Sequence, residues 1–262
     1  MTEMRVASLA SGSKGNAYIV EQDGEALLID CGLCLKTLRM RLRELLSKSG
    51  DGCVPNLCGV LLTHSHSDHA AGLRPLLSKH GVPVYANVMT AEATAIQERI
   101  DDSAFVCFEN GQSFDVGPFE VSAFSIPHDT SDPVGYLVRG TSVYFHGTDI
   151  GMPLDSVGLK LAEADIATLE ANHDPVMLRT SGRPPSLIQR IAGPRGHLSN
   201  DDAGDLVRRF ASPRLSRLAL AHLSRDCNAP HLALEAVRSA LEEVGRADVL
   251  LKVLSQDEAT WI

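Results

Sequence analysis

Three histidines and one aspartate stand close together in the sequence, at His64, His66, Asp68 and His69. They follow the apolar run 57–62, which predicts a buried strand, so they stand where that strand ends. Imidazole and carboxylate groups are costly to bury without partners, and metal ions are suitable partners. In an extended loop, residues two apart face the same side, so His64 and His66 can bind one ion. Asp68 and His69 can then face a second.

Further candidate ligands follow predicted strands later in the chain. His128 comes directly after the strand-like segment 120–125 and before a loop with prolines, and could give the first ion a third imidazole. Asp149 follows another strand and is flanked by glycines, where its two oxygens can bridge two ions. His222 directly follows the apolar strand 215–221 and best fits the second ion.

Polar residues at turns are candidates for substrate contacts. The turn 11–16 has amides and hydroxyls that could hold an anion, with Ser13 and Asn16 as candidates, but a simple hairpin turn explains the same pattern. His197 lies at a glycine turn just before a predicted helix cap, a place suited to an exposed acid or a phosphate-binding group. His173 could bind substrate or have a structural role.

The composition limits the class of protein. With 262 residues, 44% of them hydrophobic, the chain can form a substantial core, and we expect one domain over residues 1–262. The N-terminus does not read as a signal peptide, and no apolar run reaches the ~18 residues of a membrane span, so we expect a cytoplasmic protein that does not bind membranes.

The charge distribution favours an anionic substrate. A net charge of −9 argues against a protein that coats nucleic acid, but two bound divalent ions would leave the pocket itself at about +1. Between Arg179 and Arg225 the chain has nine arginines and three acidic residues, and these arginines could line a path for a phosphate backbone.

The six cysteines allow three interpretations. Cys31 and Cys34 could form a redox pair, or could join Cys53 and Cys58 in a structural zinc site. Apolar neighbours and the expected compartment favour ordinary reduced thiols instead.

Strands and helices alternate along the chain. The predicted strands are 6–10, 17–20, 26–29, 57–62, 83–86, 104–108, 120–125, 134–138, 142–145, 166–170, 215–221 and 249–254. The predicted helices are 35–48, 70–80, 89–98, 175–178, 186–192, 200–210 and 232–244. This pattern predicts an α/β (α+β) fold in which two β-sheets are packed together and flanked by helices.

When all of these candidate residues are considered, the chain resembles the YycJ/WalJ branch of the metallo-β-lactamase superfamily. The resemblance covers nearly the whole length and rests on Ser-Gly-Ser-x-Gly-Asn at 11–16, Thr-His-x-His-x-Asp-His at 63–69, Thr-Asp-x-Gly at 148–151, Leu-Glu-Ala-Asn-His-Asp at 169–174 and Gly-His-Leu-Ser-Asn at 196–200. It implies an αββα sandwich, a dinuclear metal centre and a nuclease-type phosphodiesterase, with members linked to 5′ to 3′ DNA exonuclease activity in mismatch repair.

Three features depart from the family pattern. Lys14 and Cys34 stand where the family usually has Ser, and Leu-Ser-Arg-Asp-Cys-Asn-Ala-Pro at 223–230 replaces a more Asn-rich loop. None of these changes removes an expected ligand. Lys14 adds a positive charge near the expected cleft.

The resemblance extends to the related transfer-RNA-processing nucleases and implies two ligand sets that share Asp149. The first set is His64, His66 and His128, and the second is Asp68, His69 and His222. Nitrogen and oxygen donors without a thiolate suit two divalent ions, Mn²⁺ or Zn²⁺, and do not decide between them.

The same resemblance implies a mechanism in which a hydroxide held between the ions attacks phosphorus. Asp68 would orient the nucleophile or accept its proton, and His197 would protonate the departing oxygen. The expected partners are a nucleic acid, DNA more than RNA, and DNA repair proteins, with the oligomeric state left open.

Two other classes remain open. The same hydroxide could attack the carbonyl carbon of a lactone, thioester or β-lactam, although the loop after His128 lacks the Thr-Pro-Gly of glyoxalase-type thioesterases. The chain could also be an oxygen-reducing di-iron protein or a non-catalytic metal-binding regulatory protein, but the flavodiiron pattern has Glu at the position of His66.

Overall fold

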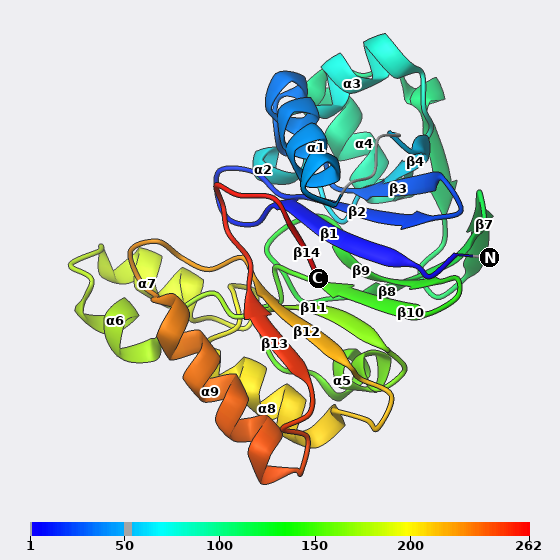
Figure 1. The fold of residues 1–262 in the computed structure, drawn as a ribbon. Coiled ribbons are helices and arrows are strands. Elements are labelled where there is room, and N and C mark those ends of the chain that lie inside the picture. Colours follow the sequence, from blue (N-terminus) through cyan, green and yellow to red (C-terminus); the bar gives the residue numbers. More distant parts are fainter. Residues whose placement is uncertain (1, 50–53) are drawn as a thin grey trace.

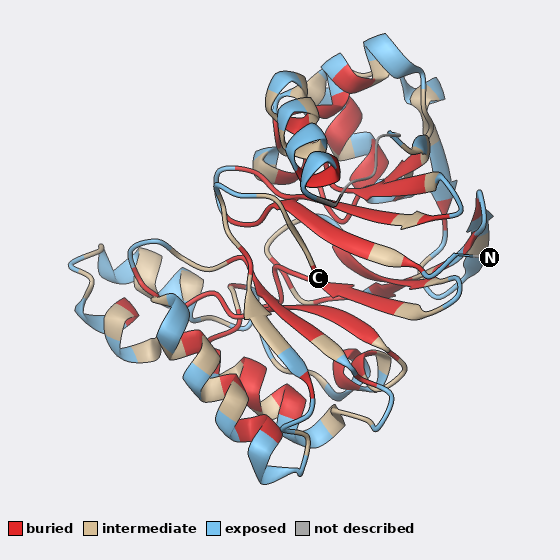
Figure 2. Cartoon of the chain, in the orientation of Figure 1, coloured by how far each residue is buried: buried red, intermediate tan, exposed pale blue. Residues whose placement is uncertain are grey.

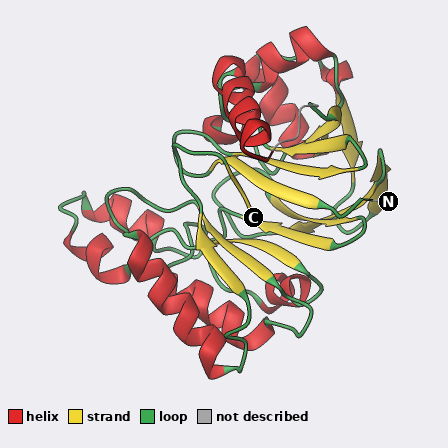
Figure 3. Cartoon of the chain, in the orientation of Figure 1, coloured by secondary structure: helices red, strands yellow, loops and turns green. Residues whose placement is uncertain are grey.

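The computed structural model describes residues 2–49 and 54–262, and its strands form two sheets of seven strands each. The sheets pack face to face, and helices cover their outer faces (Figure 1). This layered arrangement confirms the predicted α/β sandwich (Figure 3).

The first sheet has the strand order β14-β1-β2-β3-β4-β5-β6. Its strands are β1 (Arg5–Ala10), β2 (Ala17–Gln22), β3 (Glu25–Ile29), β4 (Asn56–Leu61), β5 (Val84–Asn87), β6 (Phe105–Phe108) and β14 (Thr260–Trp261). Neighbours from β3 to β6 are parallel. Parallel neighbours need crossover connections, which include α1 (Leu35–Ser49), α2 (Ser67–Ala70), α3 (Leu73–His80), α4 (Val88–Glu98) and the short 3₁₀ helix Asp102–Ala104.

The second sheet has the order β13-β12-β11-β10-β9-β8-β7. Its strands are β7 (Ser113–Val116), β8 (Phe119–Ser125), β9 (Val134–Arg139), β10 (Val143–Gly147), β11 (Ile166–Glu170), β12 (Arg217–Ala221) and β13 (Leu250–Val253). The helices that follow these strands are α5 (Asp155–Leu161), α6 (Pro175–Thr180), α7 (Pro185–Ile191), α8 (Asn200–Phe210) and α9 (Pro230–Glu243). Because β10 to β13 are parallel, their carboxyl ends lie at one edge of the sheet.

One core cluster lies between the sheets, and each sheet also packs against its helices (Figure 2). Three tyrosines of the central core are fully buried, and each hydroxyl has a partner. Tyr18 donates to Ser11 Oγ (2.8 Å), Tyr136 to the Leu62 carbonyl (2.6 Å) and Tyr144 to Thr168 Oγ1 (2.8 Å). These hydrogen bonds avoid the cost of burying an unpaired hydroxyl just below the strand ends.

The predicted elements differ from the observed ones in a few places. The sequence pattern did not predict β7, β14 and α5, and it predicted one helix over 70–80 where the structure has α2 and α3. The break falls at Gly72, where a Cβ atom would lie 2.0 Å from the Leu33 carbonyl oxygen and 2.7 Å from that of Cys31. Only glycine allows this close approach.

The described cysteines are free thiols. Cys31 is buried and Cys34 is exposed, and no described cysteine belongs to a group able to hold a metal ion. Cys53 lies outside the described residues. Within the described part of the chain, no helix is long and apolar enough to cross a bilayer.

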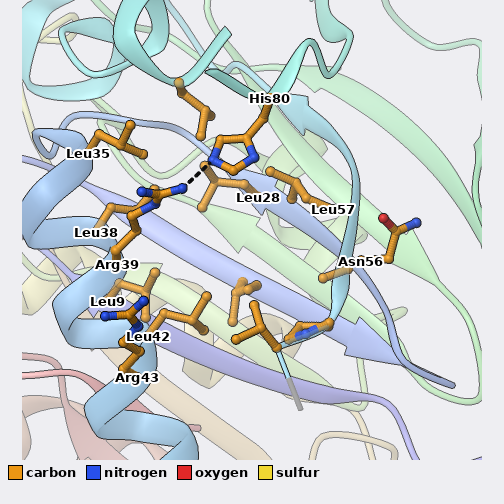
Figure 4. A pocket seen from close by; sticks show the side chains of 15 residues that line it. Leu9, Leu28, Leu35, Leu38, Arg39, Leu42, Arg43, Asn56, Leu57 and His80 are labelled. Carbon is orange, nitrogen blue, oxygen red and sulfur yellow. Dashed lines mark hydrogen bonds between the residues drawn. The ribbon is translucent and has the colours of Figure 1, made fainter. Parts of the chain in front are cut away.

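The underside of α1 encloses an apolar cavity of ≈ 560 Å³ against the first sheet (Figure 4). Leu35, Leu38 and Leu42 line it from α1, and Arg39 Nη2 lies 2.9 Å from His80 Nε2 at its rim. Among the described residues, no group able to hold a metal ion lines this cavity.

Replacing Gly72 by alanine should destabilise the fold by about 1–3 kcal/mol, because the new methyl group must displace the backbone of the 31–33 segment. Urea denaturation would measure the loss. Ala71→Gly, at the exposed neighbouring position, should cost only about 0.5–1 kcal/mol and serves as the control. An unchanged midpoint for Gly72→Ala would contradict the close packing.

Candidate metal centre

The expected ligands come from loops that follow strands of both sheets. His64 follows β4 and His128 follows β8, while Asp149 and His222 follow β10 and β12. Asp149 and His222 have left-handed backbones, with φ of 58° and 57°. Non-glycine residues adopt this conformation at an energetic cost, and such residues are common at functional sites.

The first group consists of His64, His66 and His128, whose ligand atoms lie within 4.8 Å of one another. The Nε2 atom of His64 lies 3.2 Å from Nδ1 of His66. The Nδ1 atom of His128 lies 2.9 Å from the Gly196 carbonyl oxygen, which fixes the ring when Nδ1 carries the proton. Its Nε2 is then free to bind a metal ion.

The second group consists of Asp68, His69 and His222, again with ligand atoms within 4.8 Å. Asp68 Oδ2 lies 3.5 Å from His69 Nε2 and 3.6 Å from His222 Nε2. Asp149 stands beside both groups, with Oδ2 3.1 Å from His69 Nε2 and Oδ1 3.7 Å from His128 Nε2. All the expected ligands therefore converge on one small volume.

Asp30, which was not among the predicted site residues, contacts His69 of the second group and fixes its ring. Its buried carboxylate accepts hydrogen bonds from the Thr63 backbone N–H (2.9 Å) and hydroxyl, and lies 2.7 Å from His69 Nδ1. The contact turns His69 Nε2 toward Asp68 and Asp149. Asp30 directly follows β3, so the strand-end rule used for the other ligands could have identified it.

Glu170 is the second missed residue and plays a similar part in the other sheet. Its Oε1 lies 2.9 Å from Nδ1 of both His197 and His222. Its Oε2 accepts from the backbone N–H of Ile150 (2.7 Å) and Leu198 (3.1 Å). Because both oxygens have partners, Glu170 is better suited to orient the imidazoles than to bind an ion itself. It ends β11 and lies inside the 169–174 motif.

The electrostatics of the pocket favour bound cations. Burial lowers the pKa of His64 well below its usual value and also lowers that of His66, which keeps both rings neutral. Burial alone would raise the pKa of Glu170, but His197 and His222 outweigh it and lower the pKa to about 2. Asp149 also stays ionised, because His222 and His69 lower its pKa despite burial. Neutral imidazoles and ionised carboxylates are the forms that bind metal. In the second group, burial alone would lower the pKa of both rings, but Asp30 raises the pKa of His69 and Asp149 raises that of His222 to about 10, so both rings release a proton when an ion binds.

Buried atoms that make no hydrogen bond give a second test of whether metal ions fit. His222 Nε2 and Asp149 Oδ2 make no hydrogen bond to the described residues, although Asp68 Oδ2 lies 3.6 Å from the first and His69 Nε2 3.1 Å from the second. Buried polar atoms without partners are costly and rare. Divalent ions would satisfy both, and the nitrogen and oxygen donors suit such ions.

The pocket above these groups has a volume of ≈ 300 Å³ and is distinct from the apolar cavity under α1. It includes Ser13 and His197, two of the residues expected to contact substrate, and also Asn172 and Ser224. We assign the chemistry to this pocket because the candidate ligands open into it.

The other two expected substrate residues do not line the pocket. Asn16 is fully buried, and its Oδ1 accepts from the Gly12 N–H (2.9 Å) while its Nδ2 lies 3.3 Å from Asp68 Oδ2. Asn16 therefore links the 11–16 turn to the segment 64–69 that carries the candidate ligands. His173 is 3% exposed and lies beneath the start of α8, where it pairs with Ser199. Neither side chain reaches the surface that a substrate would touch.

Comparisons with known proteins agree with this geometry. Residues 10–149 match the model of the metallo-beta-lactamase superfamily. The chain is 34% identical over 229 residues to exodeoxyribonuclease WalJ of Streptococcus pneumoniae, covering 86% of this chain and 83% of that protein. It is 35% identical over 240 residues to exodeoxyribonuclease YycJ of Bacillus anthracis, covering 90% and 89%.

A solved structure of similar fold is Zn²⁺-bound PqqB from Methylobacterium extorquens. It has a TM-score of 0.73 and 16% sequence identity, and the match covers 98% of this chain and 99% of that one. At this identity the likeness concerns the fold alone.

The chain belongs to the metallo-β-lactamase superfamily and is a metal-dependent hydrolase. Within the superfamily, its similarity to the two exodeoxyribonucleases over most of its length assigns it to the YycJ/WalJ branch, as the sequence motifs predicted.

Substituting Glu170 by glutamine should lower the affinity for divalent ions about 10- to 100-fold, because His222 loses the carboxylate that orients its ring. Competition with a chromogenic chelator would measure this change. Glu163→Gln removes an equally sized carboxylate from the surface pair with Arg139 and should leave the affinity unaltered. Equal affinities for the two variants would show that Glu170 does not position a ligand.

Proposed function

We propose that this protein is a dinuclear metal-dependent phosphodiesterase that acts as a DNA exonuclease. The observation that carries the proposal is the position of Asp149, whose carboxylate lies beside ligand groups from both sheets. A carboxylate with two oxygens can bridge two ions. The names of the WalJ and YycJ relatives support DNA as the substrate.

One ion would be held by His64, His66 and His128. The other would be held by Asp68, His69 and His222, and Asp149 would bind both ions. Mn²⁺ and Zn²⁺ both suit these donors. Such ions, when bound, supply a water of lowered pKa and neutralise the charge that develops on a phosphoryl group.

The residues of the chain itself position the substrate and move protons. The side chain of Asp68 is 22% exposed at the pocket floor, where it can orient the attacking water and accept its proton. His197 is held at Nδ1 by Glu170, and its ring borders the pocket. Burial opposes a proton on His197, but Glu170 prevails and raises its pKa. His197 is thus suited to protonate the oxygen that leaves phosphorus.

The wider assignment follows from the resemblance to the exonuclease branch. We propose a 5′ to 3′ polarity, DNA in preference to RNA, a role in mismatch repair alongside other repair proteins, and a cytoplasmic location. We further propose that residues 1–262 act as a single domain, since the ligands come from both sheets.

The purified protein should digest oligonucleotides in the presence of Mn²⁺ or Zn²⁺. Duplex and single-stranded DNA labelled at either end would reveal the activity and its polarity. Asp149→Ala should lower kcat at least ~10²-fold, because it removes the shared ligand. His231→Ala, a histidine outside the described metal groups, is the matched control. Intact DNA together with turnover of nitrocefin or a thioester would support an acyl hydrolase instead.

His197→Ala should lower kcat for DNA about 10²- to 10⁴-fold, as expected for the loss of a general acid. The effect should be much smaller with bis-p-nitrophenyl phosphate, because its leaving group needs no proton. Steady-state kinetics on both substrates would measure the difference. Equal losses on the two substrates would contradict the assignment of His197 as the proton donor.

A further inference from the structure

α7 is a helix that packs only loosely on the rest of the molecule. None of its seven residues is buried, and Figure 1 shows it with α6 beyond the end of the second sheet. Its C-terminal end is fixed beside the metal centre, because the His197 N–H donates to the Ile191 carbonyl (2.9 Å). A helix with no buried side chain contributes little to the core, so another role must account for its apolar residues.

One face of this segment lines the metal pocket. The pocket-lining residues here are Arg183, just before α7, and Leu187, Arg190 and Ile191 within it. Within α7, the spacing of Leu187, Arg190 and Ile191 is that of a single helix face, and Arg183 stands two residues before the helix begins. The segment therefore brings one guanidinium group to the pocket near each end of α7, with the aliphatic strip of Leu187 and Ile191 beside them.

Both arginines are engaged in ion pairs in which one partner is largely exposed. Arg190 Nε lies 2.5 Å from Asp129 Oδ2, with side-chain exposures of 61% and 27%. Arg183 Nη2 lies 2.8 Å from Asp226 Oδ2, with side-chain exposures of 28% and 76%. Ion pairs that are open to solvent on one side contribute less stability than buried ones, so each guanidinium can exchange its carboxylate for another anion. The planar guanidinium is well suited to phosphate.

The other arginines between Arg179 and Arg225 do not line the pocket. Arg214 pairs with Asp165 and Arg217 with Glu3, both at the amino ends of β11 and β12, opposite the metal groups. The sequence had suggested that these arginines could together line a path for a phosphate backbone. The structure shows instead that they do not form one continuous path. In the described chain only Arg183 and Arg190 bring positive side chains of this stretch to the pocket.

We propose that Arg183 and Arg190 bind two phosphates of a nucleic-acid strand that flank the reacting phosphodiester, with Leu187 and Ile191 against the sugar or base between them. This inference rests on the proposed function. A single small anion would need only one arginine, whereas cations at both ends of α7 match a substrate with repeated phosphates. The aliphatic strip matches the less polar surface between those phosphates.

The test uses Arg183→Ala and Arg190→Ala, with Arg214→Ala as the matched control at a remote surface pair. Each of the first two should weaken binding of a labelled, cleavage-resistant phosphorothioate oligonucleotide to the metal-loaded protein about 10- to 100-fold, measured by fluorescence anisotropy. The slope of log Kd against log salt should fall by about 1 per arginine. In cleavage assays, the ratio of kcat/KM for DNA to that for bis-p-nitrophenyl phosphate should fall about tenfold.

Asp226→Asn separates a phosphate contact from a structural ion pair. It frees Arg183 and should tighten oligonucleotide binding several-fold, whereas a purely structural pair would give no gain. Unchanged Kd values and salt slopes in the arginine variants and in Asp226→Asn would overturn the inference, as would a wild-type protein that does not bind the oligonucleotide. DNA left intact by a wild-type protein that binds it would instead overturn the proposed function.

Discussion

Ionisable side chains are buried together at the edge shared by the two sheets, and the free-energy cost of burying their charges has to be offset. Ion pairs and hydrogen bonds around the cluster offset this cost. Asp149 is 2% exposed and has imidazoles from several loops around it. Buried charges are tolerated only when paired and hydrogen-bonded. The left-handed backbone at Asp149 and His222 is one cost of bringing these groups together, and partners from both sheets offset it.

Each sheet supplies one carboxylate that orients imidazoles rather than facing the pocket. Asp30, after β3, fixes His69, and Glu170, at the end of β11, fixes His197 and His222. Both carboxylates are fully buried and also accept hydrogen bonds from backbone N–H groups. Ring nitrogens held in this way can act on the opposite side, where an ion or a substrate would lie.

The cavity under α1 and the metal pocket differ in a way that bears on function. The cavity under α1 is lined mainly by leucines and other apolar side chains, whereas the metal pocket has polar groups on its floor and α7 along its side. The site of chemistry is identified by the polar side chains that converge on a pocket, and not by the volume of the pocket. The loose packing of α7 leaves Arg190, and Arg183 just before the helix, able to exchange ion-pair partners, whereas contacts with Asp30 and Glu170 hold the imidazoles of the pocket floor in place.

The local sequence was enough to predict most strands and helices, the αββα fold and the grouping of His64, His66, Asp68 and His69, because alternation, caps and motif spacing act over a few residues. It did not reveal Asp30 and Glu170, since a lone carboxylate after a strand has no distinctive neighbours in the chain. It also did not distinguish Arg190 from Arg214, which face opposite ends of the second sheet. Which distant side chains meet depends on how the sheets stack, and only the tertiary structure decides that.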